Sequence, residues 1–498
     1  MLKGKLSLQS KEVLAASMGR AVGAASGFAL FWLLVRALPP GQYAQLGLIN
    51  GLQSFAATIL LGPVYAQTGR EVWNWHNEQV LDIHFSDLII GMSLLFLSGN
   101  VILVIFGAVV GWISPDALIG SVVGAIIYTC WIPLSTIFGI ASVLRERIAF
   151  ASYLALDGAA KIIVVGVLLF LKVETAWFYF VCIQVAALVS ASLVYWGYRH
   201  TLAKYGLNIS RLRRLRGTSI RTSLRYIKGS FSLRLTTLFN WLLTTGNRYV
   251  LEPLVSRSAL GLFLAAWGLG TTVLGAVETF HSAVMIPVLY QHTSGEKDTA
   301  ERRSRENAHY LATLLSVLLP LCCVFWLYAD RLASFFLSKQ VHLSTNVVRA
   351  GILFASFSIL VGIFNSFSLV ERKLWPSMVG VGCSLVVGLS ALGYLTVRFG
   401  VEIGSWGLVL GIFIGCLVIL GLMHSAICFD EILNWGTTVS IGILVCVTTA
   451  WGAFSINKLL AVPGLRSLFA AWAIIGGIWA TYVWFVVRPS VSRYRPRD

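Results

Sequence analysis

The sequence has few charged residues and lacks the motifs of most enzyme classes. Charged residues make up 12% of its 498 positions, roughly half the share found in soluble domains. It has no P-loop of the form GxxxxGK[ST] and no Gly-x-Ser-x-Gly elbow. No His/Asp/Glu cluster has the spacing of a catalytic metal site. We therefore expect a protein that is not an enzyme and needs neither a cofactor nor a metal.

The sequence also lacks a disulfide framework and a large extramembrane domain. Its eight cysteines, from Cys130 to Cys446, all lie within apolar segments and show no zinc-ligand spacing. No predicted loop on the outer side is long enough to hold a folded domain. This excludes a periplasmic catalytic or receptor module.

What the sequence does have is a series of apolar blocks. Hydrophobic residues make up 57% of the chain, and the blocks have the length of about 20 residues that a helix needs to cross a bilayer. This pattern predicts an all-α polytopic membrane protein. We predict fourteen spans, at 13–36, 43–68, 86–112, 117–142, 149–171, 175–198, 229–250, 258–289, 308–329, 346–370, 375–397, 403–427, 437–456 and 466–487.

The basic residues between the spans predict the orientation. Under a cytoplasmic N-terminus, inner segments hold about 25 Lys and Arg and outer segments about 10, which satisfies the positive-inside rule. We therefore place both termini in the cytoplasm, together with the basic break at 201–228. The net charge of +17 then reports topology and contact with anionic membrane lipids, and nucleic-acid binding is not expected.

The two halves of the sequence share a pattern that suggests an internal duplication. The first predicted span holds Arg20 near its start and Arg36 at its end, and GQY opens the next span. The seventh holds Arg234 and Arg248 in matching places, and GLF opens the span after it. Repeated halves are common in transporters. We predict an N-terminal lobe at 1–200, a basic inter-lobe loop at 201–228, a C-terminal lobe at 229–430, and two further spans with a basic tail at 431–498.

The opening segment LAASMGRAVGAASGFALFWLLVRALPPGQYAQLGLINGLQSF resembles polysaccharide flippases of the Wzx type, in the multidrug/oligosaccharidyl-lipid/polysaccharide exporter superfamily. The resemblance rests on Gly19-Arg20, on Arg36, on the turn LPPGQY and on Gly47. It implies two six-helix lobes around a central cavity, and twelve spans are commoner in that family than fourteen.

The resemblance also implies a function. Such proteins move an undecaprenyl-diphosphate-linked oligosaccharide across the bacterial inner membrane by alternating access, for exopolysaccharide, capsule or O-antigen synthesis. A polysaccharide polymerase and chain-length proteins are then expected partners. The alternatives are a multidrug exporter of the same superfamily and a polysaccharide polymerase or ligase.

Two arginine-bearing helix faces are candidates for the cavity wall. Arg20 lies on a small, partly polar face, although its head could instead snorkel to the nearby membrane surface. The second face is a stripe on the seventh span whose members are spaced as one side of a helix. It consists of Arg234, Thr237, Trp241, Thr245 and Arg248. A Trp among hydroxyls and arginines can stack on a sugar ring and attract phosphate, whereas a polar seam between helices is the simpler alternative.

Four further ionisable residues fall within predicted spans. Asp157 and Lys161 are spaced to pair on one helix, either as a structural clasp or as a pair that a diphosphate separates, with Lys161 then in the cavity. Glu278 and His281 lie one turn apart and could relay a proton. We predict Asp157, Glu278 and His281 as ion-coupling residues, with proton or sodium as the ion.

Overall fold

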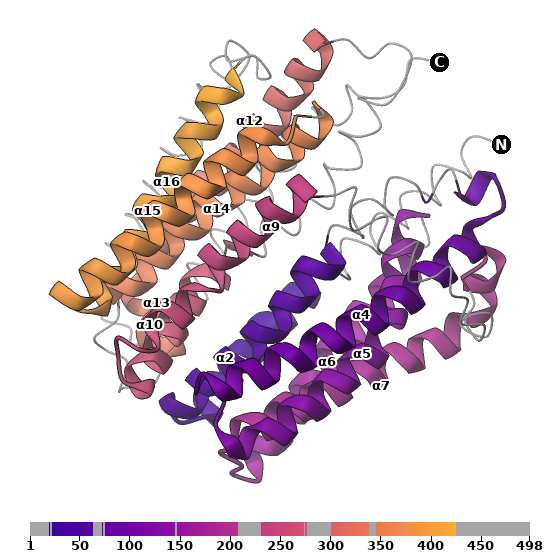
Figure 1. The fold of residues 1–498 in the computed structure, drawn as a ribbon, viewed down its shortest axis with the longest axis horizontal. Coiled ribbons are helices and arrows are strands. Elements are labelled where there is room, and N and C mark those ends of the chain that lie inside the picture. Colours follow the sequence, from indigo (N-terminus) through magenta and orange to yellow (C-terminus); the bar gives the residue numbers. More distant parts are fainter. Residues whose placement is uncertain are drawn as a thin grey trace, which may run out of the picture.

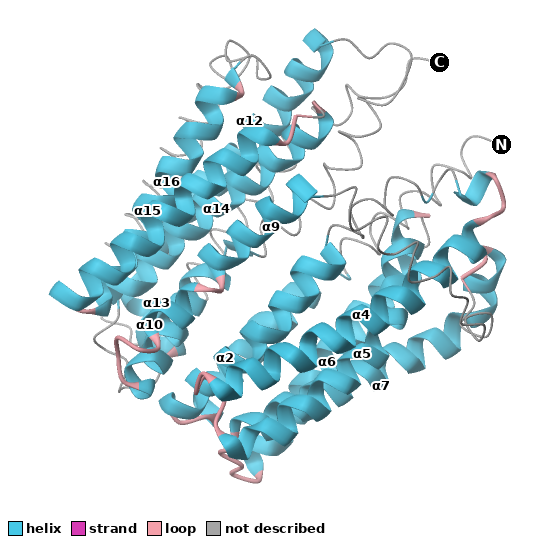
Figure 2. Cartoon of the chain, in the orientation of Figure 1, coloured by secondary structure: helices cyan, strands magenta, loops and turns pink. Residues whose placement is uncertain are grey.

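The computed structural model of the chain describes residues 19, 22–62, 72, 75–144, 147–207, 231–272, 274–275, 300–337, 345–371 and 373–424. These residues form helices joined by short turns, and no β-strand occurs among them (Figure 2).

The helices gather into two bundles (Figure 1). The N-terminal bundle consists of α2 (Pro40–Ala56) with its π-helical continuation η1 (Ala57–Leu61), α4 (Leu81–Val109), α5 (Pro115–Val143), α6 (Arg147–Phe170) and α7 (Ala176–Lys204). The C-terminal bundle consists of α9 (Phe231–Thr244), α10 (Asn247–Leu251), α12 (Ala300–Leu327), α13 (Ala329–Phe336), α14 (Thr345–Val370), α15 (Trp375–Phe399) and α16 (Val401–Leu422). Two further long helices carry no label: Val22–Ala37, here called the first helix, and helix 257–272.

The predicted all-α polytopic membrane fold is confirmed. Among the described residues, eight helices are long and apolar enough to cross a membrane, or up to nine if α12 and α13, bent by 68°, form one broken span. Each of the first twelve predicted spans overlaps a described helix. The predicted spans 437–456 and 466–487 lie outside the described residues, so the total of fourteen stays a prediction, as do the lobe boundaries.

Proline and glycine set several helix ends. Pro40 opens α2 and Pro376 lies in the first turn of α15, where the missing N–H costs no hydrogen bond. Gly400 separates α15 from α16 with a φ of 88°, a conformation that favours glycine. The two helices then pack backbone to backbone, with Gly388 against Gly411, as small residues allow in membrane helices.

The small residues of the first helix bring it close to α6. A Cβ built on Gly19 would overlap Ala151, and one on Gly23 would lie 3.6 Å from Leu154. The first helix therefore lies close to α6 at Gly19 and Gly23, whereas a Cβ on Gly27 would meet no described atom within 4 Å.

The buried core differs between the bundles. A single large apolar cluster fills the C-terminal bundle, whereas the N-terminal bundle holds three smaller ones. The large cluster includes Ala44 and Leu48 of α2, so α2 packs into the core of the opposite bundle.

The predicted seventh span is not one continuous helix. The Trp241 carbonyl accepts from the amides of both Thr245 (2.8 Å) and Gly246 (2.9 Å), which ends α9 and leaves α10 as a separate short helix. A side chain at position 246 would overlap the Leu242 carbonyl, so glycine allows the tight turn. This break positions Arg248 and Tyr249 independently of the long part of α9.

Candidate substrate cavity

A cavity of about 480 Å³ lies where the two bundles meet. The first helix and α2 form one side, and α9, α10, helix 257–272 and α14 form the other. Its wall combines aromatic rings with hydroxyl and amide groups. The aromatic residues are Phe31, Tyr43, Trp267 and Phe354, and the polar neutral ones are Asn50, Thr244, Thr245, Thr271, Thr272 and Ser358.

Arg248 is the single charged residue among the described residues that line this cavity. Its Nε donates to the Thr245 carbonyl at 2.9 Å, and its Nη1 donates to the Gly47 carbonyl of α2. A Cβ on Gly47 would lie 3.6 Å from that Nη1 and would overlap the Leu264 side chain. Glycine at position 47 therefore makes room for the Leu264 side chain of the opposite bundle, and the Arg248 guanidinium lies at an ordinary contact distance.

Two further hydrogen bonds join α9 and α10 to α2 beside Arg248. The Tyr249 hydroxyl donates to the Leu48 carbonyl at 2.7 Å, and the Trp241 Nε1 donates to the Ser54 Oγ at 3.0 Å. Together with the bond from Arg248 to Gly47, we call these contacts the inter-lobe seam. The seam closes one side of the cavity.

The two bundles also touch at the end where α2 begins, which we call the closed end. Arg257 Nη2 donates to the Gly111 carbonyl at 2.6 Å, and Arg36 Nη2 donates to the Phe335 carbonyl at 3.3 Å. Gly261 packs directly on the backbone of Pro40. Among the described residues, no ion pair crosses between the bundles, so neutral acceptors receive all these inter-lobe donors.

The structure divides the predicted stripe on the seventh span. Arg248 and Thr245 line the cavity. Trp241 is only 7% exposed and packs edge-on against Phe55 at 4.7 Å between ring centroids, so it belongs to the seam rather than to the described cavity wall.

The other members of the stripe lie toward the opposite end of α9. Arg234 does not line the described cavity, and its Nε and Nη2 are buried without a hydrogen-bond partner in the described part of the chain. Thr237 follows one turn later, 4.0 Å from the Cβ position of Gly62.

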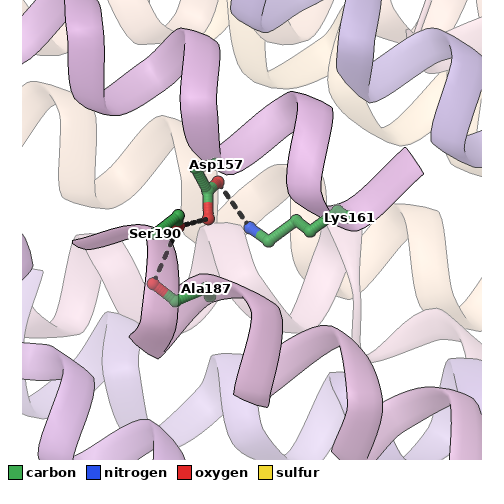
Figure 3. A network of polar contacts seen from close by, with 4 residues as sticks. All are labelled: Asp157, Lys161, Ala187 and Ser190. Carbon is green, nitrogen blue, oxygen red and sulfur yellow. Dashed lines mark hydrogen bonds and ion pairs between the residues drawn. The ribbon is translucent and has the colours of Figure 1, made fainter. Parts of the chain in front are cut away.

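Asp157 and Lys161 form the ion pair that their spacing suggested (Figure 3). Lys161 Nζ lies 2.6 Å from Asp157 Oδ2, and the side chains are 22% and 15% exposed. The Ser190 hydroxyl of α7 lies 3.3 Å from Asp157 Oδ1 and 3.0 Å from the Ala187 carbonyl, so it can donate to either oxygen (Figure 3). The pair joins α6 to α7 and does not line the described cavity.

Three predicted site residues, Arg20, Glu278 and His281, lie outside the described residues. Several cavity residues were not predicted from the sequence, among them Tyr43, Asn50 and Trp267. Asn50 could have been found as a polar residue within an apolar span. Nothing in the local sequence marks the two aromatic residues, because aromatic side chains are common in membrane helices.

No family model and no curated protein sequence matches the chain, whereas several solved structures share its fold. The lipid II flippase MurJ in an inward closed conformation is similar over 96% of this chain and 99% of its own, with a TM-score of 0.60 and 12% identity.

Two structures of a multidrug resistance MATE family transporter of the MOP superfamily are also similar. The inward-facing structure has a TM-score of 0.57 and 14% identity, covering 85% of this chain and 99% of its own. The outward-facing one has a TM-score of 0.58 and 13% identity, covering 86% and 97%. The chain thus shares the fold of these transporters. Its membership of the superfamily and the narrower Wzx-type resemblance stay predictions.

Proposed function

We propose that the chain is a flippase that translocates an undecaprenyl-diphosphate-linked oligosaccharide across the bacterial inner membrane by alternating access. The observation that carries this proposal is the charge of the cavity. Its described wall holds one guanidinium, that of Arg248, and no carboxylate. Such a cavity suits an anionic headgroup, because a guanidinium matches the geometry of phosphate oxygens.

The neutral part of the wall suits the sugars. Hydroxyls of Thr244, Thr271 and Ser358 and the amide of Asn50 can exchange hydrogen bonds with sugar hydroxyls. The Trp267 ring offers an apolar face for a pyranose ring. Arg248 would place the diphosphate beside the inter-lobe seam, next to the sugar-binding groups.

The contacts between the bundles suit a cavity that opens alternately on two sides. Neutral carbonyl and hydroxyl acceptors hold the seam and the closed end. Such bonds each contribute about 0.5–1.5 kcal/mol net from a neutral donor and about 1.5–3 kcal/mol from an arginine, so no single contact fixes the bundles together. The fold is also known in inward-facing and outward-facing forms, as the titles of the two MATE structures state. We place the closed end on the periplasmic side, which follows from cytoplasmic termini.

The coupling ion is part of the proposal. Asp157, with Glu278 and His281, is proposed to carry a proton or bind sodium during the cycle. The Asp157–Lys161 ion pair supports this, because an anionic substrate that attracted Lys161 would free the carboxylate. Polysaccharide polymerase and chain-length proteins are proposed partners on the same pathway.

A multidrug exporter is the second candidate, and one observation favours it. Four aromatic side chains line the cavity, and aromatic walls are common in pockets for drug-like molecules. The lone arginine argues against it, because a cavity for cationic drugs needs negative charge.

Loss of the protein tests the proposal directly. Deletion should leave the oligosaccharide on its undecaprenyl carrier at the cytoplasmic face of the membrane, and expression of the wild-type chain should restore export. Leaflet-selective labelling of the lipid-linked sugar measures this. Accumulation at the periplasmic face would indicate a polymerase or ligase. Normal lipid-linked sugar with reduced drug export would indicate the multidrug exporter.

A further inference from the structure

We infer that Arg248 couples the binding of an anionic headgroup to the opening of the closed end. A phosphate group in the cavity takes the guanidinium away from the Gly47 carbonyl and thereby releases α10 from α2. This inference rests on the proposed function and names the regulation of the same site.

Arg248 lies in two functional positions at once. It lines the cavity, and its Nη1 donates to the Gly47 carbonyl across the seam. Its Nε donates to the Thr245 carbonyl at 2.9 Å. Neither bond uses Nη2, which leaves one nitrogen of the guanidinium available to the cavity.

A bidentate contact with phosphate uses two nitrogens on one edge of the guanidinium. Nη2 shares one such edge with Nη1 and the other with Nε. Both edges therefore include a nitrogen that now donates to a carbonyl. The bond to Gly47 occupies one of the two Nη1 hydrogens. A phosphate in the cavity therefore weakens this bond by drawing the whole guanidinium away from the Gly47 carbonyl, and turning the group to present the Nε edge moves Nη1 from the same carbonyl.

The competition favours phosphate over the seam. The guanidinium is charged in both contacts, but a phosphate adds the attraction of its own negative charge and a second parallel hydrogen bond, whereas Gly47 offers one neutral carbonyl. In addition, no described residue of the cavity wall is a carboxylate that would hold the guanidinium in place.

Movement of Arg248 has a structural path to the rest of the seam. The next residue, Tyr249, donates to the Leu48 carbonyl at 2.7 Å, and its ring lies 4.4 Å from that of Trp112 between centroids. Arg248 and Tyr249 both belong to α10, which the turn at Thr245 and Gly246 separates from α9. A short helix next to a turn can shift without moving the long helix.

A disulfide across the closed end can report its state. The Cβ position of Gly41 lies 3.8 Å from the Ser258 Oγ, with no other neighbour within 4 Å among the described residues. A chain carrying Gly41→Cys and Ser258→Cys can therefore form this disulfide when the end is closed.

The experiment measures the rate of disulfide formation by mass spectrometry after addition of a mild oxidant. The full chain is reconstituted in phosphatidylcholine vesicles that contain undecaprenyl diphosphate, phosphatidylglycerol or the uncharged undecaprenol. Undecaprenyl diphosphate should slow the reaction at least about fivefold relative to undecaprenol. Slowing by phosphatidylglycerol as well would support the inference and extend the ligand to lipid phosphates in general.

Two substitutions in the same double-cysteine background distinguish the role of Arg248 from that of an arginine at the closed end. Arg248→Lys should remove the response, because an ammonium presents a point charge without the two-nitrogen edge. Arg257→Lys is the matched control: Arg257 donates to the Gly111 carbonyl but does not line the cavity, so the response should persist. Closure without ligand shows that each variant is folded.

Equal rates with undecaprenyl diphosphate and undecaprenol would overturn the inference, as would a full response in Arg248→Lys. These outcomes differ from failure of the proposed function. A ligand-dependent disulfide rate together with normal lipid-linked sugar in the deletion strain would reject the proposed substrate and support the coupling role of Arg248. Accumulated lipid-linked sugar together with a ligand-independent rate would support the proposed substrate and reject that coupling role.

Discussion

The two halves of the chain offer matching features to each other at the closed end, but they pack unequally. Gly41 opens α2 and faces Ser258, while Gly261 in helix 257–272 faces Pro40 at the start of α2. The first contact leaves 3.8 Å between the Cβ position and the serine oxygen, whereas the second is direct contact with backbone. The repeated Gly-x-aromatic pattern therefore predicts that these two helix starts meet. The packing shows that Gly261, in the C-terminal half, makes the tighter of the two contacts.

The arginines that join the bundles show the same inequality. Arg36 in the first helix is exposed and donates to Phe335 at 3.3 Å. Arg248 is half-buried, makes two carbonyl contacts and lines the cavity. The C-terminal half thus supplies most of the donors that hold the bundles together.

The largest effect is expected from filling the tighter glycine contact. Gly261→Ala places a methyl group against the Pro40 backbone, which cannot move aside as a flexible side chain would. Overpacking of this kind costs about 1–3 kcal/mol, which shifts the closed state by roughly 5- to 150-fold. Export of the lipid-linked sugar in a deletion strain should fall accordingly.

Two matched substitutions test whether the inequality between the halves is real. Gly41→Ala meets Ser258 at an ordinary contact distance, and Gly393→Ala in α15 meets no described atom within 4 Å. Both should export at nearly the wild-type rate when membrane abundance is equal. If Gly41→Ala were as defective as Gly261→Ala, the two contacts would be equivalent and the comparison would fail.

Arg20 and Arg234 test whether the proposed cavity extends beyond its described part. Arg20→Lys and Arg234→Lys should keep some export, whereas Ala or Glu at either position should remove most of it, because a lysine keeps the charge and loses the bidentate geometry. Arg234 fits this expectation in having two buried nitrogens without a partner among the described residues. Near-normal export by a well-expressed Arg20→Gln, Arg234→Gln double variant would exclude both from the cavity.

The N-terminal half has an ion pair between α6 and α7 that separates two hypotheses for Asp157. If Asp157 carries the coupling ion, Asp157→Asn should abolish the response of transport to a pH gradient, as should Glu278→Gln. If the pair is a structural clasp, Asp157→Asn alone should destabilise the chain because Lys161 loses its partner. The double variant Asp157→Asn, Lys161→Met should then recover both stability and the gradient response. Thermal unfolding and proton-driven flux in vesicles measure the two effects.

The sequence predicted the fold better than the site. Apolar blocks depend on local composition, so the helices could be anticipated, whereas the contact between Gly19 and Ala151 could not, because it depends on which helix packs against the first one. The break after Thr244 could not, because residues 229–250 are apolar enough for one continuous span. That break moves Arg248 onto α10, and Trp241 of the same stripe lies in the seam because Ser54 of a distant helix accepts its N–H. The positions of Arg248 and Trp241 depend on which helices pack against α9 and α10. The residue pattern on one helix face does not contain that information.

A smaller effect is expected at Arg36 than at Arg248, its counterpart in the C-terminal half. Its guanidinium lies 4.3 Å above the Trp32 ring and donates one long hydrogen bond to Phe335. Exposed cation–π contacts contribute about 0.5–1 kcal/mol, and Arg36 does not line the described cavity. Arg36→Gln should therefore lower export by about fivefold at most, since 1 kcal/mol corresponds to roughly a fivefold change in an equilibrium. Arg248→Gln, measured beside it at equal abundance, should lower export at least about tenfold, because it loses a charged hydrogen bond worth roughly 1.5–3 kcal/mol. Equal losses of export in the two variants would mean that both arginines act only by holding the bundles together. The position of Arg248 in the cavity wall would then have no role in substrate binding.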